Sequence, residues 1–592
     1  MPTDQLLIVS ILAATMLLFI VNIWRYDIVA GFALMACVYT GIVPIEKAFE
    51  GFSHPAVITV ACVLVISKAL QSSGVVELFL RYLAYTRSGV KSQIAANAGI
   101  TAVLSAFMNN IGALALMLPV TIRDAVKAKR NASVLLMPLS FASLLGGLTT
   151  LIGTPPNIIV ATFRENNAGE AFSMFDFTRV GLVTALAGIA FLVLIGWRLL
   201  PRTRTSNEGV TNVHHQFARY ITELRLPAGS ALINQTVGDL EKFCENEISV
   251  TAIFRNQRRR LAPSYSEKLY EDDTLIIEGD SAALQPLLED PGMVIAGAEE
   301  VDTDWLRSPD VRIIEAVLMP NSVVEGIAMR EAEIHQRYSV NLLGVAREGR
   351  ASRALLKHVR FKTGDVLLLQ GEPESLKLAC KNLGCLAIKN RGIEFSTRRG
   401  SLITPGIFAA GIAATATGLV PAQIAFATVV GLLVVLRMVS LQEAYNSIEW
   451  PIIVLLGFLI PVGEALQTTG AAQTITVGVL ENAAALPAWA VIASIMVISM
   501  LLSDLVHNTP TAVLMCPIAF SLAGSLGYSP DAFLMAVAVG AASPYLTPIG
   551  HQSNTLVMGP GGYRFSDYWR MGLPLDFVIV SVATPMIVWV WL

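Results

Sequence analysis

Charged residues are scarce in this sequence. Asp, Glu, Lys and Arg make up 15% of its 592 residues, and 54% are hydrophobic. Globular proteins carry about 25% charged residues on average. Uncharged runs long enough to cross a bilayer recur along the chain, beginning with residues 5–24. This run lacks the basic leader of a signal peptide. The composition therefore predicts an α-helical polytopic membrane protein.

Motifs for catalysis and cofactor binding are also lacking. The six cysteines show no paired spacing, so neither a disulfide framework nor a zinc site is predicted. We find no Gly-x-Gly-x-x-Gly nucleotide fingerprint, no phosphate loop and no catalytic triad. No basic face for nucleic acid stands out. We therefore expect a protein that is not an enzyme, uses no cofactor and binds no nucleic acid.

Composition divides the chain into membrane regions and an insert. Apolar runs stop near residue 200 and resume near residue 400, and the residues between them are soluble in character. The predicted parts are a first transmembrane repeat at 1–200, two insert modules at 201–300 and 301–400, and a second transmembrane repeat at 401–592.

The two membrane regions repeat each other. Three pairs of segments keep the same order at offsets of 396 to 398 residues. The pairs are ALQSSG (69–74) with ALQTTG (465–470), MNNIGALALMLPV (108–120) with VHNTPTAVLMCPI (506–518), and IGTPPNIIV (152–160) with IGHQSNTLV (549–557). A duplicated membrane fold explains this pattern better than chance.

Charge indicates that the repeats are inverted. The connections 81–91 and 121–130 are rich in Lys and Arg, whereas neither residue occurs from Met438 to Tyr563. Cytoplasmic loops are enriched in Lys and Arg, so equivalent loops lie on opposite sides of the membrane. Basic residues at both ends of the insert predict that it is cytoplasmic, in a protein of the inner (plasma) membrane. Each repeat then has about five spans, and both termini lie outside.

Polar residues, which are costly inside a bilayer, gather at two hairpin tips and two helix breaks. The hairpins are predicted at 92–125 and 486–527, and the breaks contain GTPPN and TPIGHQSN. Unwound carbonyls suit sodium, and half-helix N-termini suit an anion. Packed, kinked helices are the alternative, but these breaks are paired and each carries an Asn.

The tips NNIGALALMLP and HNTPTAVLMCP, with their breaks, resemble the divalent anion:sodium symporters of the ion-transporter superfamily. The resemblance covers both membrane regions, although GHQSN fits only loosely. It implies a sodium-coupled secondary transporter with elevator-type alternating access in a lipid bilayer. It also implies a homodimer.

Carried over position by position, the resemblance implies two sodium sites and one anion site. The first sodium site comprises Ser105, Asn109, Asn110 and Gly153. The second comprises Ser503, the Val506 backbone, Asn508 and Gly550. The substrate-binding residues are Asn110, Asn508, Thr509, His507, Asn157 and Asn554.

Two positions depart from the family pattern. Ile111 stands where a Thr is expected, and His507 where a Ser is expected. The lost hydroxyl and a positive charge on His507 favour a compact inorganic anion such as sulfate; a neutral tip histidine is the alternative. Protons can replace sodium at the second site. A di- or tricarboxylate symporter, a ligand-gated anion channel and a membrane-anchored sensor are the alternative functions.

The insert contains two copies of one small α/β module. ISVTAIFRN aligns with YSVNLLGVARE, and DDTLIIEGD with GDVLLLQGE, which predicts strands that end in turns. SAALQPLLED and PESLKLACKN are predicted helices. The pattern resembles the C-terminal module of regulators of potassium conductance, the TrkA-C type. This resemblance implies dimerisation and a small-molecule ligand at the insert.

Overall fold

The computed structural model describes most of the chain. It omits residues 1, 22–23, 74–88, 129, 201–219, 280–293, 296–311, 388–401, 475, 477–485 and short segments between 228 and 358. The predicted helix 281–290, most of the basic connection 81–91 and most of the basic residues flanking the insert lie outside the described residues.

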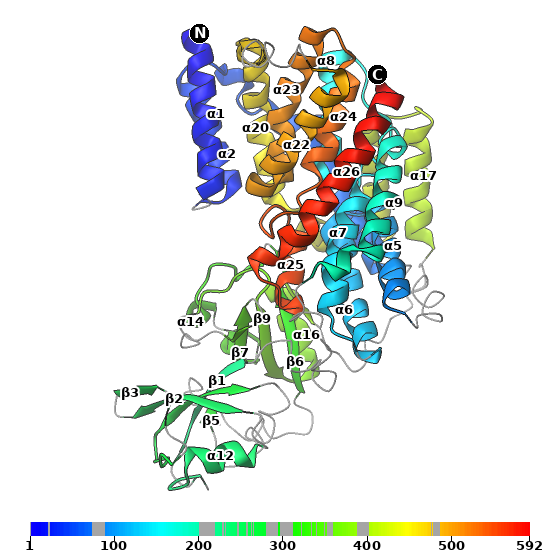
Figure 1. Ribbon diagram of the computed structural model, residues 1–592. Coiled ribbons are helices and arrows are strands. Elements are labelled where there is room, and N and C mark those ends of the chain that lie inside the picture. Colours follow the sequence, from blue (N-terminus) through cyan, green and yellow to red (C-terminus); the bar gives the residue numbers. More distant parts are fainter. Residues whose placement is uncertain are drawn as a thin grey trace.

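The described residues form a helical body with a strand-containing insert at one end (Figure 1). Both chain termini lie at the opposite end of the body. Before the insert, the elements are α1 (Thr3–Val21), α2 (Tyr26–Tyr39), η1 (Ile45–Lys47), η2 (Glu50–Ser53), α3 (Pro55–Ser72), α5 (Val90–Phe107), α6 (Asn110–Lys127), α7 (Ser133–Gly147), α8 (Pro155–Ala168), α9 (Thr178–Leu194) and η3 (Gly196–Arg198). After it come α17 (Ile403–Ala416), α18 (Ala422–Val435), α19 (Leu441–Ser447), α20 (Trp450–Thr468), α22 (Ala488–Val506), α23 (Asn508–Leu526), α24 (Pro530–Ala541), α25 (Gln552–Gly561), η6 (Phe565–Asp567) and α26 (Tyr568–Trp591).

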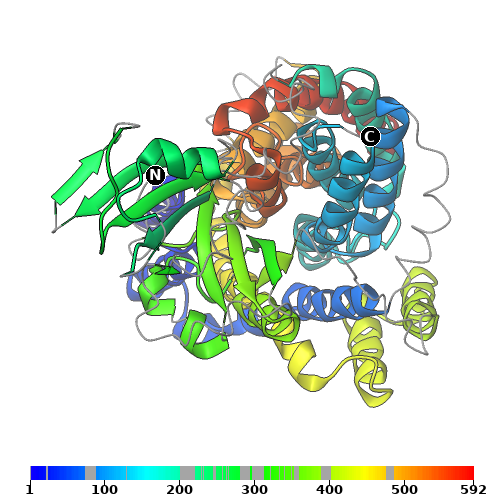
Figure 2. The same ribbon diagram turned by 90° about the horizontal axis from the view of Figure 1, so that it is seen from below.

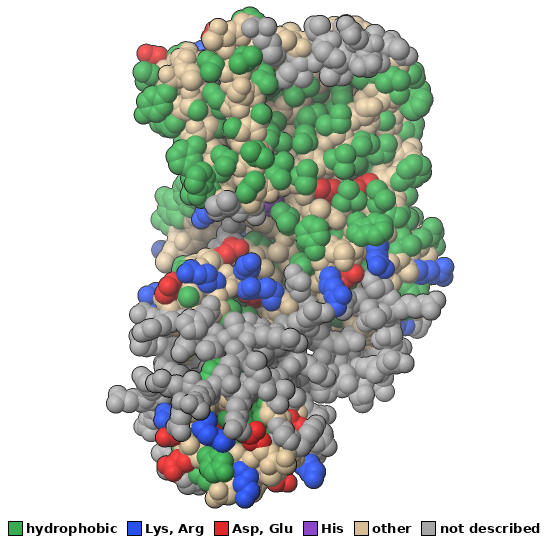
Figure 3. All heavy atoms as spheres, turned by 60° about the vertical axis from the view of Figure 1, so that its left-hand side comes forward, with side chains coloured by type: hydrophobic (Ala, Val, Ile, Leu, Met, Phe, Trp, Pro, Cys, Tyr) green, Lys and Arg blue, Asp and Glu red, His purple; other side chains and the backbone are tan. Residues whose placement is uncertain are grey.

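The helices of the body are suited to a bilayer. Among the described residues, six are long and apolar enough to cross a membrane, and others are apolar but shorter. Hydrophobic side chains cover the visible face of the body, and Lys and Arg gather where the body meets the insert (Figure 3). A helix that is apolar on all sides is typical of a membrane span. The fold is therefore that of a helical polytopic membrane protein.

Helix pairs occupy both predicted hairpin positions. In the first pair, α5 ends at Phe107 and α6 starts at Asn110. In the second, α22 and α23 meet at His507, whose φ of 91° is rarely adopted by residues other than glycine. Each pair is followed by an interrupted helix, namely α7 with α8 and α24 with α25.

The insert contains two five-stranded sheets with the same topology. Their orders are β3-β2-β4-β1-β5 and β8-β7-β9-β6-β10, which are identical when each sheet is numbered from its own first strand. Register shifts occur at equivalent places in β2 and β7. The elements are β1 (Tyr220–Arg225), α12 (Val237–Phe243), β2 (Ser249–Arg255), β3 (Arg258–Leu261), β4 (Thr274–Gly279), β5 (Val294–Ile295), β6 (Arg312–Leu318), α14 (Met329–Ala332), α15 (Ile334–Tyr338), β7 (Asn341–Arg347), β8 (Arg350–Ala351), β9 (Val366–Gly371), α16 (Pro373–Leu383) and β10 (Cys385–Ala387). The predicted helix PESLKLACKN is α16.

Each sheet also has the same ion pair. Arg255 donates two hydrogen bonds to Asp273, at 2.7 and 2.6 Å, and Arg347 donates two to Asp365, both at 2.7 Å. Both carboxylates are buried, whereas the Arg side chains are partly exposed. The hydrogen bonds to Asp273 raise the pKa of Arg255. The repeated pair shows that the two modules share side-chain contacts as well as strand order.

We expect Asp273→Asn to destabilise the insert far more than Asp272→Asn. Asp273 is fully buried against Arg255, whereas the side chain of Asp272 is 68% exposed in its pair with Arg225. Breaking a buried ion pair costs about 2–3 kcal/mol when one partner is partly exposed, and an exposed pair contributes less than about 1 kcal/mol. Thermal unfolding of the full chain in detergent measures the difference. Equal shifts of the two midpoints would contradict this account.

The second sheet packs against α25 of the helical body. Gly364 has a φ of 83°, and a Cβ atom on it would lie 2.7 Å from the Thr555 carbonyl oxygen. A Cβ on Gly559 would lie only 2.1 Å from the Gly364 carbonyl oxygen. Two backbones therefore touch where only glycine fits. Seen from below, the two sheets lie to one side of the body and leave the light-blue helices uncovered (Figure 2).

Candidate functional site

Each interrupted helix is held open by one asparagine. Asn157 Nδ2 donates to the carbonyl oxygens of Gly147 and Thr150, at 3.2 and 2.8 Å. Asn554 Nδ2 donates to the carbonyl oxygens ten and seven residues before it in the same way, at 2.9 and 3.1 Å. Both side chains were predicted to bind substrate. The structure instead directs their Nδ2 groups to the break carbonyls, and neither residue lines the pocket described next.

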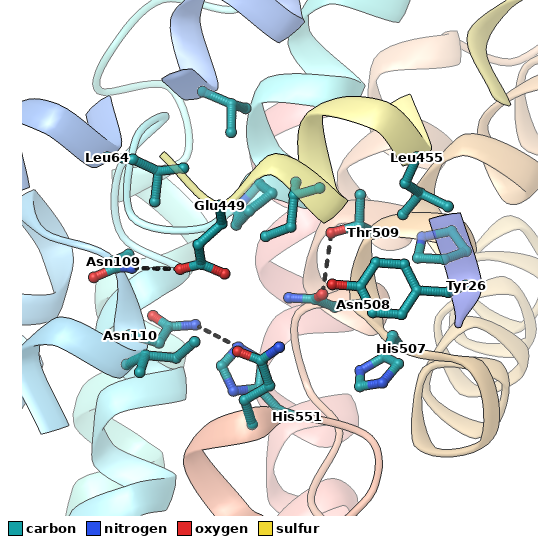
Figure 4. A pocket seen from close by; sticks show the side chains of 16 residues that line it. Tyr26, Leu64, Asn109, Asn110, Glu449, Leu455, His507, Asn508, Thr509 and His551 are labelled. Carbon is teal, nitrogen blue, oxygen red and sulfur yellow. Dashed lines mark hydrogen bonds between the residues drawn. The ribbon is translucent and has the colours of Figure 1, made fainter. Parts of the chain in front are cut away.

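A pocket of about 60 Å³ lies where the hairpin tips meet the two breaks (Figure 4). Four predicted substrate residues line it: Asn110, His507, Asn508 and Thr509. The other lining residues are Tyr26, Val60, Leu64, Asn109, Ile111, Pro155, Glu449, Ile452, Leu455, Pro510, His551 and Gln552. The pocket thus joins segments from both membrane regions.

Five helices begin at this pocket: α2 at Tyr26, and the four helices that follow the hairpin tips and the breaks. The first residues of α6, α8, α23 and α25 are Asn110, Pro155, Asn508 and Gln552, and all four line it. The first N–H groups of a helix have no partner within the helix, and the helix dipole places partial positive charge at that end. Such ends bind anions. No Lys or Arg is among the pocket-lining residues that the structure describes, so helix ends supply the positive potential.

Oxygen atoms gather around the Asn110 side chain, at the place predicted for the first sodium site. The Asn110 amide lies 2.7 Å from Ser105 Oγ. Its Nδ2 donates to the carbonyl oxygens of Gly153 and Ser143, at 3.2 and 3.1 Å. Hydroxyl and carbonyl oxygens suit a hard cation, and here the Asn110 Nδ2 group takes their lone pairs. The structure therefore brings together three of the four residues predicted for this site.

His551 determines which way the Asn110 amide faces. Its Nδ1 accepts the Ser553 N–H at 3.0 Å, so in the neutral ring Nε2 carries the proton. Nε2 lies 3.4 Å from the Asn110 amide. The N–H of Nε2 therefore faces the Asn110 oxygen, and the Asn110 nitrogen faces the oxygen cluster.

Asn109, the fourth predicted ligand, points to the other side of the tip. Its Oδ1 accepts the Gly112 N–H at 2.9 Å and the Ser67 hydroxyl at 3.3 Å. Its Nδ2 donates to Glu449 Oε1 at 3.3 Å. Asn109 thus closes the first turn of α6 and contacts the one acidic side chain among the described pocket-lining residues.

Two of the four residues predicted for the second sodium site, Ser503 and Gly550, lie close together beside the second break. Gly550 packs so tightly that a Cβ on it would lie 3.0 Å from the Ser503 carbonyl oxygen. Ser503 Oγ donates to the Ala541 carbonyl at 2.6 Å. Asn508 lines the pocket, whereas Val506 does not.

Asp504 stabilises the same break. Its Oδ1 accepts the N–H groups of Leu546 and Thr547, at 2.9 and 3.2 Å. Thr547 Oγ1 donates to the Asp504 carbonyl at 2.8 Å. A carboxylate that accepts two backbone N–H groups fixes the unwound segment in place.

Four polar pocket residues were not assigned to the site from the sequence. Tyr26 and Glu449 lie outside the predicted tips and breaks, whereas His551 and Gln552 lie within the second break. Figure 4 shows the Glu449 carboxylate pointing into the pocket from the start of α20. The Tyr26 ring packs edge-on against His507, with centroids 5.6 Å apart. Tyr26 and Glu449 each stand just before an apolar run, a position from which a polar side chain can reach a membrane cavity. That signal could have identified them.

Comparison with known proteins identifies the family. The family model described as "CitMHS: Citrate transporter" matches residues 16–540 and 487–592. The chain belongs to the citrate transporter family. It is therefore a multi-pass membrane transporter and not an enzyme. The predicted ion-transporter superfamily is confirmed. Within it, the family that matches is the citrate transporter family and not the predicted divalent anion:sodium symporters.

Full-length relatives support the family assignment. An uncharacterized transporter of Synechocystis sp. is 29% identical over 98% of this chain and 96% of its own length. The uncharacterized transporter YfbS of Escherichia coli is 30% identical over 99% of both chains. Sodium/sulfate cotransporter 1 of Chlamydomonas reinhardtii is 25% identical over 56% of this chain and 39% of its own length.

Proposed function

We propose that the chain is a cation-coupled symporter that takes up a small divalent anion, sulfate or a related inorganic anion. The observation that carries the proposal is the meeting of the N-termini of α6, α8, α23 and α25 at one small pocket. Converging helix ends favour a compact, symmetrical oxyanion, which can accept N–H groups at the starts of α6, α23 and α25. α8 begins with Pro155 and Pro156, which have no N–H, so it contributes only its dipole. The printed function of the sodium/sulfate cotransporter relative is consistent with this substrate.

Pocket size also favours a compact anion. A cavity needs about 10–15 Å³ to hold one water molecule. The central pocket, of about 60 Å³, therefore holds roughly four to six water-sized groups. A tetrahedral oxyanion is of this size, and a tricarboxylate is much larger. Ile111 at the pocket adds apolar surface where a hydroxyl would help to hold a second carboxylate.

Glu449 supports coupling to a cation. A divalent anion beside this carboxylate would be repelled unless positive charge entered with it. We propose sodium as the coupling ion. The first ion would be held by the Ser105 hydroxyl, the Gly153 carbonyl and the Asn110 oxygen, which requires the Asn110 amide to rotate so that its oxygen replaces its nitrogen in the cluster. The second ion would lie beside Ser503 and Gly550. Asn109 and Val506 remain predicted ligands of these sites.

The proposed architecture follows from the same features. Two inverted repeats move the site by elevator-type alternating access, and the insert lies in the cytoplasm. The Lys and Arg side chains where the body meets the insert support this orientation (Figure 3). We propose that the insert modules are TrkA-C-like domains that bind a small ligand and regulate transport, in a homodimer in the inner (plasma) membrane.

A di- or tricarboxylate is the second candidate substrate, because the matching family model is described as a citrate transporter. Purified protein in vesicles should take up radiolabelled sulfate in a saturable manner, driven by an inward sodium gradient. Excess thiosulfate should compete, and citrate or succinate should not. Competition by citrate at equal concentration would favour the second candidate, and large unsaturated currents would favour a channel.

A further inference from the structure

A second cavity, of about 210 Å³, lies along the same helices as the central pocket. It is lined by His54, Ala56, Ile159, Phe163, Asn166, Asn167, Ile460, Gly463, Glu464, Gln467, Thr468, Val513 and Pro517. Four helices, α3, α8, α20 and α23, therefore contribute walls to both cavities.

Along α8 and along α23, the residues that line the two cavities are separated by a similar number of positions. The central pocket is lined by Pro155 of α8 and Pro510 of α23, and the second cavity by Phe163 and Pro517 of the same helices. Each pair is seven or eight residues apart, or about 11 Å at 1.5 Å per residue. The second cavity thus lies about two helical turns from the central pocket along the same helices.

Apolar side chains form the end of the second cavity that is nearer the central pocket. Ile159 and Val513 line the second cavity, are each 6% exposed, and lie four and three residues beyond Pro155 and Pro510 on their helices. Val513 packs against α20, where a Cβ atom on Gly463 would lie 3.3 Å from Val513 Cγ1. The two cavities are therefore separate in this conformation.

The cavities lie at different depths of the body. The central pocket includes Tyr26, the first residue of α2, and His551, which precedes α25. The surface is hollowed between the body and the insert (Figure 3). The second cavity includes the last turns of α8, which lies at the end that carries both termini (Figure 1). That end is outside the cell in the proposed orientation.

We propose that the second cavity is the outer vestibule through which the anion and its coupling cation enter. This inference rests on the proposed function. The amides of Asn166, Asn167 and Gln467 offer N–H donors to a hydrated oxyanion, and the Glu464 carboxylate attracts the cation. His54 and Asn166 form the polar end of the vestibule, with their side-chain nitrogens 2.9 Å apart.

The test uses a charged thiol reagent that cannot cross membranes, applied to the outside of intact cells that express the full chain. Asn167→Cys places a thiol on the exposed wall of the vestibule. Glu170→Cys is the matched control, because Glu170 is exposed at the same end and does not line the cavity. The ratio of sulfate uptake after and before treatment is compared among both variants and the wild type.

We expect the reagent to lower uptake by about fivefold or more in Asn167→Cys, because the attached charged group obstructs the cavity and repels or retains ions there. Uptake should change by less than about 1.5-fold in Glu170→Cys and the wild type, as for surface positions away from a site. Excess external sulfate should slow the modification of Asn167→Cys. Modification without loss of uptake, or labelling only after permeabilisation, would overturn the vestibule while leaving sulfate transport intact. If the wild type took up no sulfate, the proposed function would fail and this inference with it.

Discussion

Asn508→Ala should reduce sulfate uptake about 10- to 100-fold at subsaturating substrate. Asn508 begins α23, lines the pocket and accepts the Thr509 hydroxyl at 3.2 Å. The substitution removes a hydrogen bond to a charged ligand, which is worth about 1.5–3 kcal/mol, and tenfold corresponds to about 1.4 kcal/mol. Initial rates of radiolabelled uptake into vesicles measure the effect, normalised to the protein present in the membrane.

Asn446→Ala is the control for this variant. Asn446 is exposed on α19 and does not line the pocket, so its loss should change uptake by less than about twofold. Asn110→Ala should behave like Asn508→Ala, because it breaks the contact with Ser105 and the approach to His551. Normal uptake by both pocket variants would refute the assignment of the site.

Gly559→Ala should disturb both stability and transport, although the change is one methyl group. The new Cβ would lie 2.1 Å from the Gly364 carbonyl oxygen, so the second sheet must shift away from α25. Overpacking of this kind costs about 1–3 kcal/mol. The altered contact lies on α25, which begins at Gln552 directly after His551, and both of these residues line the pocket. We therefore expect a lower unfolding temperature together with a reduced rate of sulfate uptake.

Gly431→Ala separates this effect from a general effect of alanine. Gly431 lies within α18, and a Cβ on it would meet no atom within 4 Å. Alanine in an open helical position is stabilising by about 0.5–1 kcal/mol, so this variant should be as stable as the wild type or more so. An unchanged unfolding temperature and unchanged uptake in Gly559→Ala would show that the insert does not bear on the site.

The sequence by itself determined the membrane class, the hairpin positions and part of the pocket wall. Apolar runs and scarce charge are local properties that the bilayer imposes on every span, so they can be read without the fold. The paired tips single out Asn110 and Asn508, which line the pocket, because polar residues in an otherwise apolar segment are visible in the local sequence. The equivalence of the two insert modules could also be predicted, because the matching strand segments are short local patterns.

Tertiary structure alone decided which polar side chains face the pocket. Asn157 and Asn554 carry the motif, yet the unwound carbonyls take their Nδ2 groups, because a buried carbonyl without a partner is costly. Glu449 and Tyr26 join the pocket from helices far away in the sequence, and no local pattern encodes that meeting. The contact of Gly364 with Gly559 is likewise a matter of packing between distant segments, and it links the insert to the helix that starts at the site.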